Sequence, residues 1–323
     1  MRYFAFGRQA LVEAFRLCGV GPGDNVLLPS YICRNVLASL HAVRANPSYY
    51  NVGEDLQADF DPDSVPHAKA VLAVNYFGFP QQLDIFERYR ERTEALIIED
   101  NAHGLFSRDE EGRFLGTRPD IGVFSIRKSV PLPNGAALVV NNPQLNDNLS
   151  KQERFELSTD DEFFKRKQFI RRYVIGEWGI PAKRIVFLLS RMRRWLMTGS
   201  PIPKSDKRWE TVLPEPSKCS RFIKNGIKTA NPESERKRRR ELYLWLDEWI
   251  GRRDNCVPVF ENLPSGVVPY GYPFICEEDD LKGFERLLSR KGFYCITWPD
   301  LPEAVEKDAP PFYTKVRLVP FLW

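Results

Sequence analysis

Apolar residues in the first 145 positions follow two kinds of spacing. Short, mostly apolar runs have the length of buried strands, at residues 25–29, 70–75, 95–99, 121–126 and 136–140. Between them, apolar residues recur every three to four positions, which predicts helices at residues 9–18, 36–43 and 83–92. Continuously apolar strands separated by helices are typical of a parallel sheet covered on both faces. We therefore predict a mostly parallel, three-layer α/β/α fold for this part of the chain.

The pattern changes after residue 142. Residues 151–210 hold fifteen Lys and Arg against eight Asp and Glu, and they carry few strand signals. Within them, residues 173–197 mix apolar and basic positions, which predicts one or two basic amphipathic helices. Proline pairs at residues 201–203 and 214–216 indicate a linker.

The last third of the chain combines strands and helices again. A helix is predicted at residues 233–250, with the arginines of 236–240 on a solvated face and the apolar residues of 242–250 on a buried one. A strand, a helix and a strand then follow at residues 267–276, 280–291 and 293–298. This order predicts a second, smaller α/β domain. We divide the chain into a large domain at residues 1–215, including the basic helical segment 151–210, and a small domain at residues 216–323.

Composition places the 323-residue chain among ordinary globular proteins, with 43% hydrophobic and 28% charged residues. No apolar run approaches the ~18 residues of a membrane span. The formal charge of +4 is too small to indicate a nucleic-acid partner. Arg8, Glu13 and Arg16 interrupt the apolar N-terminus, which makes a signal peptide a poor interpretation. We expect a cytoplasmic protein.

The cysteines and histidines do not indicate a metal site. The six cysteines are scattered without a close pair, and the chain has three histidines. A zinc site needs closely spaced ligand pairs. We therefore expect no metal ion, and reduced, mostly buried thiols.

Candidate chemistry follows two of the predicted strands, at the ends where open parallel sheets bind ligands. Asp100 follows the apolar run 95–99, and His103 lies three residues further on. A carboxylate at the end of a buried strand needs a cationic partner, and a protonated pyridine nitrogen would be one. The alternative is an ordinary helix cap.

Ser125 and Lys128 lie at the end of the next predicted strand. A partly desolvated lysine can lose its proton and attack a carbonyl as a free amine, and the serine could donate to a phosphate. The alternative is a basic pair on the surface.

The third feature is Gly7, just before the first predicted helix, where free N–H groups suit a phosphate. Many helices begin this way without a ligand. The order of Gly7, Asp100, Ser125 and Lys128 is nevertheless that of a pyridoxal-phosphate enzyme of the aspartate-aminotransferase fold. In such enzymes the protein binds and tunes a cofactor that acts as an electron sink.

Several segments resemble the DegT/StrS-type sugar aminotransferases, which are pyridoxal-phosphate enzymes of fold type I. The similarity covers most of residues 5–142 and returns at residues 232–302. The matching segments are Gly-Arg-Gln-Ala-Leu at 7–11, Val-Gly-Pro-Gly-Asp-Asn-Val-Leu-Leu-Pro at 20–29, Asn-Tyr-Phe-Gly-Phe-Pro at 75–80, Glu-Asp-Asn-Ala-His at 99–103, Gly-Arg-Phe-Leu-Gly at 112–116, and residues 269–274 and 292–302.

The resemblance implies a site for pyridoxal 5'-phosphate. Asp100 would pair with the pyridine nitrogen, and His103 would lie beside the ring or its hydroxyl. Lys128 would form the internal aldimine and carry the proton between two carbons during transamination. Ser125 would bind the phosphate, and Tyr31 would cover the ring face. The backbone of Gly7, Arg8 and Gln9 would complete the phosphate site.

The same resemblance implies an activity and partners. The amino group would pass from glutamate or glutamine to a keto sugar, expected to be nucleotide-linked and used in polysaccharide or secondary-metabolite synthesis. The family builds its active site at a subunit boundary, so a homodimer is expected.

Differences from the family pattern leave two alternatives open. Ser125 and Lys128 are three positions apart where the family has five, Arg8 replaces a threonine, and Asn75 replaces a histidine. The family's Asn-x-Arg loop has no match in residues 151–210. One alternative is a pyridoxamine-phosphate-dependent sugar dehydratase, which carries histidine in place of the Schiff-base lysine. The other is a non-catalytic binding or regulatory protein with a degenerate site.

The basic stretch at residues 165–194 has its own alternatives. We predict a solvated or dimer-facing pair of helices. A positive amphipathic stretch can also lie on anionic lipid, or attract an acidic nucleotide diphosphate.

Overall fold

The computed structural model describes most of the chain outside the basic segment. The described residues are 1–130, 132, 134–148, 157–158, 185, 188–189, 192–193, 195–199, 206–214, 219–251, 256–291 and 293–321. Most of the predicted basic helices at residues 173–197 lie outside these ranges.

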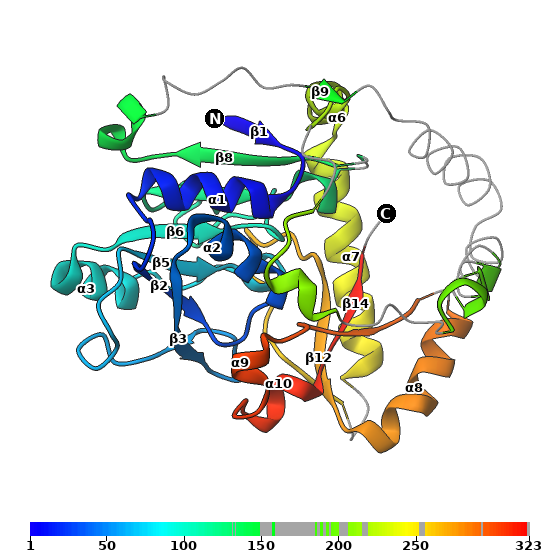
Figure 1. Cartoon of the computed structure of the whole chain (residues 1–323). Helices are drawn as coiled ribbons and strands as arrows, with labels where there is room; N and C mark the ends of the chain where they lie inside the picture. Colours follow the sequence, from blue (N-terminus) through cyan, green and yellow to red (C-terminus); the bar gives the residue numbers. More distant parts are fainter. Residues whose placement is uncertain are drawn as a thin grey trace.

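A large sheet of eight strands forms one half of the molecule (Figure 1). Its order is β1-β8-β7-β6-β5-β2-β3-β4. The strands are β1 (Arg2–Phe4), β2 (Asn25–Pro29), β3 (Asn46–Val52), β4 (Ala58–Asp59), β5 (Ala70–Val74), β6 (Leu96–Asp100), β7 (Ile121–Phe124) and β8 (Ala136–Val140). The five strands from β3 to β7 in this order are parallel, while β8, β1 and β4 pair antiparallel. The predicted mostly parallel sheet is therefore confirmed.

The helices of the large sheet begin and end close to the predicted positions. They are α1 (Gly7–Leu17), α2 (Leu37–Val43) and α3 (Asp84–Thr93). Ala10, Leu11, Ala14 and Phe15 form the buried face of α1, as their spacing predicted. The helix packs against β7, β8 and α2. Three-residue 3-10 turns η1 (Arg34–Val36), η2 (Tyr76–Gly78) and η3 (Ile126–Lys128) follow strands β2, β5 and β7.

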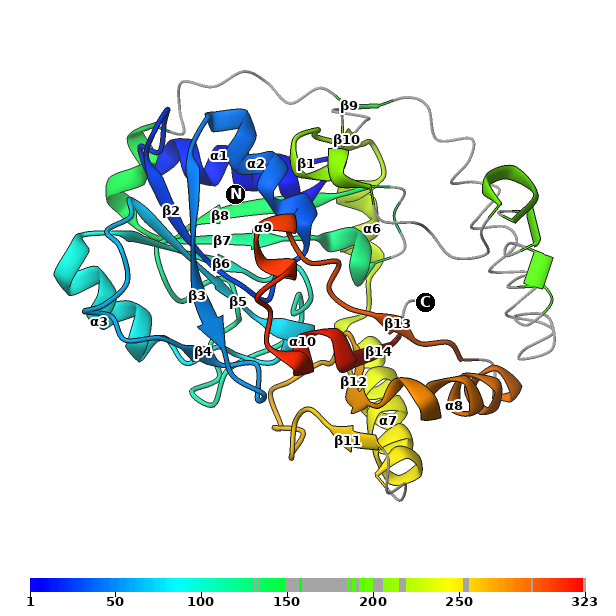
Figure 2. The ribbon, with the colours of Figure 1, turned by 60° about the horizontal axis from the view of Figure 1, so that its bottom comes forward.

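A second sheet of four strands is antiparallel throughout, with the order β11-β12-β14-β13. Its strands are β11 (Cys256–Pro258), β12 (Gly271–Cys276), β13 (Ile296–Thr297) and β14 (Val316–Pro320). The accompanying helices are α7 (Pro232–Ile250), α8 (Glu278–Arg290), α9 (Glu303–Glu306) and α10 (Pro311–Lys315) (Figure 2). The shorter elements are η4 (Pro143–Asn148), β9 (Leu157–Ser158), η6 (Lys207–Glu210), β10 (Cys219–Ser220) and α6 (Ile223–Thr229).

The prediction that the arginines of residues 236–240 lie on a solvated face of α7 is wrong for Arg239. This side chain is 1% exposed, and the buried face of the helix runs through Arg239, Tyr243, Leu246 and Ile250. The predicted buried residue Leu244 is instead 54% exposed. The guanidinium can be buried because its Nε donates to Glu235 Oε1 at 2.6 Å, so its charge is paired.

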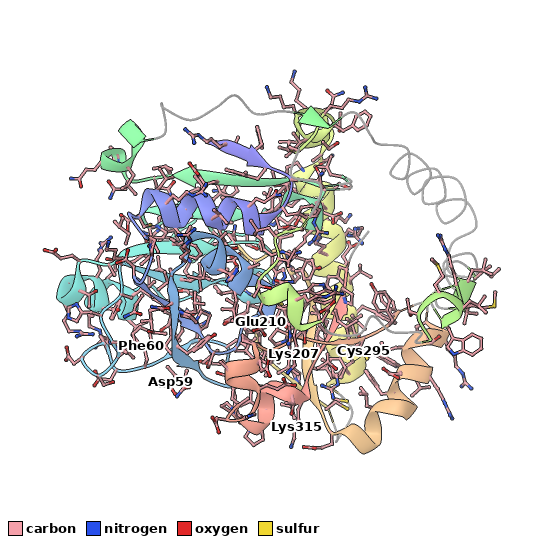
Figure 3. All side chains as sticks on the ribbon, in the orientation of Figure 1. Asp59, Phe60, Lys207, Glu210, Cys295 and Lys315 are labelled. Carbon is pink, nitrogen blue, oxygen red and sulfur yellow. The ribbon has the colours of Figure 1, made fainter. Side chains whose placement is uncertain are left out.

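The C-terminal segment returns to the large sheet and joins the two sheets. The Tyr313 hydroxyl lies 2.7 Å from Ser30 Oγ, and the backbone N–H of Arg34 donates to the Asp300 carbonyl at 2.7 Å. On η6, Glu210 accepts from the Glu303 backbone N–H at 2.9 Å (Figure 3). One apolar core includes residues of both sheets. The domain boundary at residues 215–216 therefore stays a prediction. None of the helices among the described residues is long and apolar enough to cross a membrane.

The close approach of Gly122 on β7 to the backbone of Gly116 can be tested by substitution. A Cβ at this position would lie 1.8 Å from the Gly116 carbonyl oxygen, and backbone must move to relieve that overlap. We expect Gly122→Ala to lower the free energy of unfolding by about 2–4 kcal/mol in urea titrations. Gly283→Ala on α8 is the control, because no atom lies within 4 Å of its added Cβ. It should raise stability by about 0.5–1 kcal/mol. Equal stability of the two variants would contradict the packing at Gly122.

Candidate active site

The carboxyl ends of the parallel strands bring the candidate residues to one edge of the sheet. Asp100 is the last residue of β6, Ser125 follows β7, and Lys128 closes the turn η3. Because β6 and β7 run parallel with Asp100 opposite Val123, residues that follow them lie on the same side. The result is a site assembled from adjacent strand ends.

Lys128 and His103 are in direct contact. Lys128 Nζ lies 2.9 Å from His103 Nε2, while His103 Nδ1 accepts the Phe77 backbone N–H at 3.3 Å. A ring nitrogen that accepts carries no hydrogen, so the single hydrogen of the neutral imidazole must be on Nε2. This Nε2–H therefore donates to Lys128 Nζ, which can accept only as an uncharged amine. The two hydrogen bonds together favour Lys128 as a free amine.

The electrostatic environment agrees with this assignment. Burial lowers the pKa of Lys128, and the nearby Arg127 and Arg8 lower it further against the opposing effect of Cys33 and Asp100. Burial, with Lys128 as a second cause, holds the pKa of His103 well below its usual range. Both groups are thus favoured in their neutral forms.

Aromatic rings hold the His103 ring in place. Tyr270 stacks on it at 4.3 Å between ring centroids with an interplanar angle of 11°, and Phe77 stacks at 5.7 Å and 7°. Trp298 contacts it edge-on at 5.5 Å and 62°. His103 itself is 4% exposed, so this cage shields its ring from water.

Asp100 is a buried carboxylate next to this pair. Its Oδ1 accepts the Ala102 backbone N–H at 2.9 Å. Burial raises the pKa of Asp100, while Lys128 acts in the opposite direction. A buried carboxylate in this position would be stabilised by a cationic ring nitrogen.

Two guanidinium groups form a positive site beside the start of α1. Burial and Arg127 both lower the pKa of Arg8, and burial lowers the pKa of Arg127. The Nε of Arg127 is buried and has no hydrogen-bond partner among the described residues. Gly7 adjoins this site, since a Cβ there would lie 4.0 Å from Ser125 Cβ. Two desolvated cations beside a helix N-terminus favour a bound anion such as phosphate.

Two residues predicted to contact the cofactor form hydrogen bonds within the protein. Gln9 caps the N-terminus of α1. Its side chain accepts the Phe6 backbone N–H at 3.1 Å, and its own backbone N–H donates to the Phe6 carbonyl at 3.0 Å. Tyr31 is fully buried, and its hydroxyl donates to the Trp298 carbonyl at 2.6 Å. Its ring lies 5.4 Å from the Trp298 ring, which in turn contacts His103. Tyr31 thus supports the aromatic cage, and its proposed contact with a cofactor stays a prediction.

Asn75 belongs to a buried polar network rather than to this cage. Its Nδ2 donates to Glu99 Oε1 at 2.7 Å, and its Oδ1 accepts from Arg118 at 3.1 Å. Arg118 also donates to Glu99 at 2.9 Å through Nε. This network holds the ends of β5 and β6 together.

Sequence reasoning missed residues that reach the site from distant parts of the chain. Arg239, on α7, points its Nη2 at the Lys128 carbonyl at 3.4 Å and its Nη1 at the Pro269 carbonyl at 3.5 Å. It therefore ties η3 to the segment that carries Tyr270. Arg127 lies between Ser125 and Lys128 and could have been found from that position. Tyr270 and Arg239 gave no local signal.

Comparisons with known proteins agree on one family. Residues 4–175 match the model of the DegT/DnrJ/EryC1/StrS aminotransferase family. L-glutamine:2-deoxy-scyllo-inosose aminotransferase of Streptomyces kanamyceticus is 31% identical over 136 residues, which are 40% of this chain and 31% of that protein. The match thus spans less than a third of that relative's length.

Solved structures show the same fold at low identity. The aminotransferase TlmJ from Streptoalloteichus hindustanus has a TM-score of 0.64 at 19% identity, covering 98% of this chain and 79% of that chain. DesV from S. venezuelae, in complex with a ketimine intermediate, has a TM-score of 0.64 at 20% identity, covering 99% and 80%.

The buried neutral His103 predicts a pH dependence of stability. The folded chain leaves His103 unprotonated, whereas the unfolded chain binds a proton below a pKa of about 6.5, so stability falls as the pH drops. Between pH 7.5 and 5.5, His103 should account for about 1.4 kcal/mol of the loss in unfolding free energy. Urea titrations of His103→Gln should show a loss smaller by that amount. His67→Gln changes an exposed histidine and should leave the loss unchanged. The same pH dependence in all three proteins would contradict a buried neutral His103.

Proposed function

Because the chain belongs to the DegT/DnrJ/EryC1/StrS aminotransferase family, we propose that it is a pyridoxal 5'-phosphate-dependent aminotransferase acting on a keto sugar or a related cyclic ketone. The observation that carries the proposal is the 2.9 Å contact between Lys128 Nζ and His103 Nε2 near the Asp100 carboxylate, in surroundings that lower the pKa of Lys128. A neutral amine is the form that can bond covalently to an aldehyde.

The residues of the site suit the three polar parts of this cofactor. Arg8, Arg127 and Ser125 with the start of α1 would bind the phosphate. The buried Nε of Arg127, which has no hydrogen-bond partner in the part of the chain that the structure describes, supports this assignment. Asp100 would bind the protonated pyridine nitrogen. Lys128 would hold the aldehyde carbon. When bound, the cofactor supplies an electron sink for carbanions next to nitrogen.

The chain's own residues prepare this chemistry. His103 orients the Lys128 amine and keeps a hydrogen on Nε2 directed at Nζ. Lys128 as a free amine can accept a proton and return it, which transamination requires. Tyr270, Phe77 and Trp298 pack around the His103 ring and shield it from water. Arg239 acts as a positioning residue, since it binds the carbonyl of Lys128 rather than the reacting atoms.

The proposed substrates rest on the relatives. The Streptomyces kanamyceticus relative is named for glutamine as donor and a keto cyclitol as acceptor. For this chain we propose glutamine or glutamate as the amino donor and a keto sugar, in nucleotide-linked or free form, as the acceptor. A homodimer is part of the proposal, because sites of this family lie at a subunit boundary.

Covalent trapping tests the role of Lys128. Protein incubated with pyridoxal 5'-phosphate should absorb near about 400–430 nm and lose that band on borohydride reduction. Mass spectrometry should then find the cofactor on the peptide containing Lys128. Lys128→Ala should show no adduct at this position and a loss of transamination of at least 1,000-fold. Lys69→Ala changes an exposed lysine directly before β5. It should form the adduct and transfer the amino group as the wild type does.

The same experiment distinguishes the two alternatives. A dehydratase would use the amine form of the cofactor, so ketone release without any Lys128 adduct would favour it. A degenerate binding protein would form the adduct yet transfer no amino group from any donor. A wild type that stays colourless after incubation with excess cofactor and removal of the free cofactor contradicts the proposed aminotransferase.

The two guanidinium groups predict selectivity for the phosphate. Arg127→Gln should weaken binding of pyridoxal 5'-phosphate at least tenfold, because a charge-assisted contact in a desolvated site is lost. Binding of pyridoxal, which lacks the phosphate, should change less than twofold. Arg113→Gln removes an exposed arginine and serves as the control. Fluorescence titration measures both ligands, and equal weakening of both would place Arg127 away from the phosphate.

A further inference from the structure

Two cysteines that are distant in the sequence meet in the second sheet. Cys256 begins β11 and Cys276 ends β12, and the register of the strands places them directly opposite each other. The structure holds both as thiols, with 3.5 Å between the two Sγ atoms. Cys256 is 6% exposed and Cys276 1% exposed, and both belong to the apolar core. The fold thus forms a close thiol pair that the spacing of the cysteines in the sequence does not reveal.

The hydrogen bonding of the two strands suits a covalent link between these residues. The Val259 backbone N–H donates to the Pro273 carbonyl at 3.3 Å, and hydrogen-bonded and non-hydrogen-bonded pairs alternate along antiparallel strands. Cys256 and Cys276 therefore form a non-hydrogen-bonded pair, in which the Cα atoms lie about 4.5 Å apart. A disulfide spans Cα atoms about 4.4–6.8 Å apart. The sulfur atoms can therefore join by rotation of the side chains, while the strands stay in place.

The positions of the thiol hydrogens and of β11 also suit this link. Cys256 Sγ donates to Cys276 Sγ, and Cys276 Sγ donates to the Glu277 carbonyl at 3.5 Å. The sulfur of Cys276 therefore directs a lone pair, rather than its hydrogen, at Cys256. β11 is an edge strand of the second sheet (Figure 2), and its Val257 is 59% exposed. A small solute can reach Cys256 when this edge strand opens locally.

We propose that Cys256 and Cys276 are a site of reversible oxidation, at which a peroxide joins them in a disulfide. The Cys256 sulfur attacks the O–O bond of hydrogen peroxide and becomes a sulfenic acid, with release of one water. The Cys276 sulfur then displaces the hydroxyl group, which leaves as a second water. Two S–H bonds and one O–O bond break, one S–S bond forms, and the two electrons lost by the thiols reduce the peroxide. This inference is independent of the proposed transamination, so either can fail while the other holds.

The disulfide closes a loop that carries part of the candidate active site. Tyr270 lies in this loop, where its ring stacks on His103 and its backbone N–H donates to the Phe77 carbonyl at 2.7 Å. Val268, in the same loop, donates to Ser107 Oγ at 2.9 Å and accepts from it at 3.2 Å. Closing the loop lowers the entropy of states in which it has left these partners. Oxidation therefore stabilises the packed position of Tyr270.

Peptide mapping of the full chain tests whether the disulfide forms. The protein is treated with hydrogen peroxide, its remaining thiols are alkylated, and it is digested without reduction. Mass spectrometry should find the peptide of Cys256 linked to the peptide of Cys276, and dithiothreitol should separate the two. Two alkylated thiols, oxidation to sulfinic acid without a link, or a link from either residue to another cysteine would overturn the proposal.

Thermal unfolding tests the effect on the fold. Oxidation of the wild type should raise Tm by about 5–10 °C, as expected for closing a loop of this length, and dithiothreitol should reverse the rise. Cys256→Ser and Cys276→Ala should each abolish it, and circular dichroism checks that at least one of them is folded. Cys295→Ser is the matched control, because Cys295 directly precedes β13 and β14 separates that strand from β12. It should keep the full rise. No rise in the oxidised wild type, or the same rise in the folded Cys256 or Cys276 variant, would contradict the proposed stabilisation.

Discussion

The contact between Lys128 and His103 is the interaction on which the site depends. It works because the Phe77 backbone N–H occupies His103 Nδ1, which leaves Nε2 as the donor to an uncharged Lys128 amine. Burial lowers the pKa of both groups and so shifts them toward their neutral forms. The arrangement costs stability, since the chain withdraws from water two basic groups that water would protonate. That cost is typical of a site organised for chemistry rather than for folding.

The rest of the fold holds this pair in register. Parallel strands deliver Asp100 and Lys128 to one edge, and Tyr270, directly before β12 of the second sheet, stacks on the His103 ring. Arg239 links the two halves by binding the carbonyl of Lys128 from α7. Its own burial is possible only because Glu235 pairs with it one turn earlier on the same helix. A change in α7 can therefore affect a lysine more than a hundred residues away in the sequence.

Two positive charges have a specific use in the proposed site. Arg8 and Arg127 are partly desolvated beside the start of α1, where a cofactor phosphate would neutralise them. This site requires the fold to bring two arginines together from different parts of the sequence. The net charge of +4 gives no sign of that local concentration of charge.

The sequence by itself determined the parallel strands, the helices between them and the strand-end positions of Asp100 and Lys128, because these depend on local apolar spacing. It did not predict β1, β3, β4 or β14: β1 and β4 are very short, β3 is interrupted by polar residues, and β14 contains the buried Arg317. It placed Arg239 on a solvated face, because a run of arginines looks exposed until a paired partner is known. The tertiary structure alone decided that Tyr270 and Trp298 contact His103 and that Arg239 binds the carbonyl of Lys128. Contacts between residues so far apart in the chain leave no local pattern, and only folding brings them together.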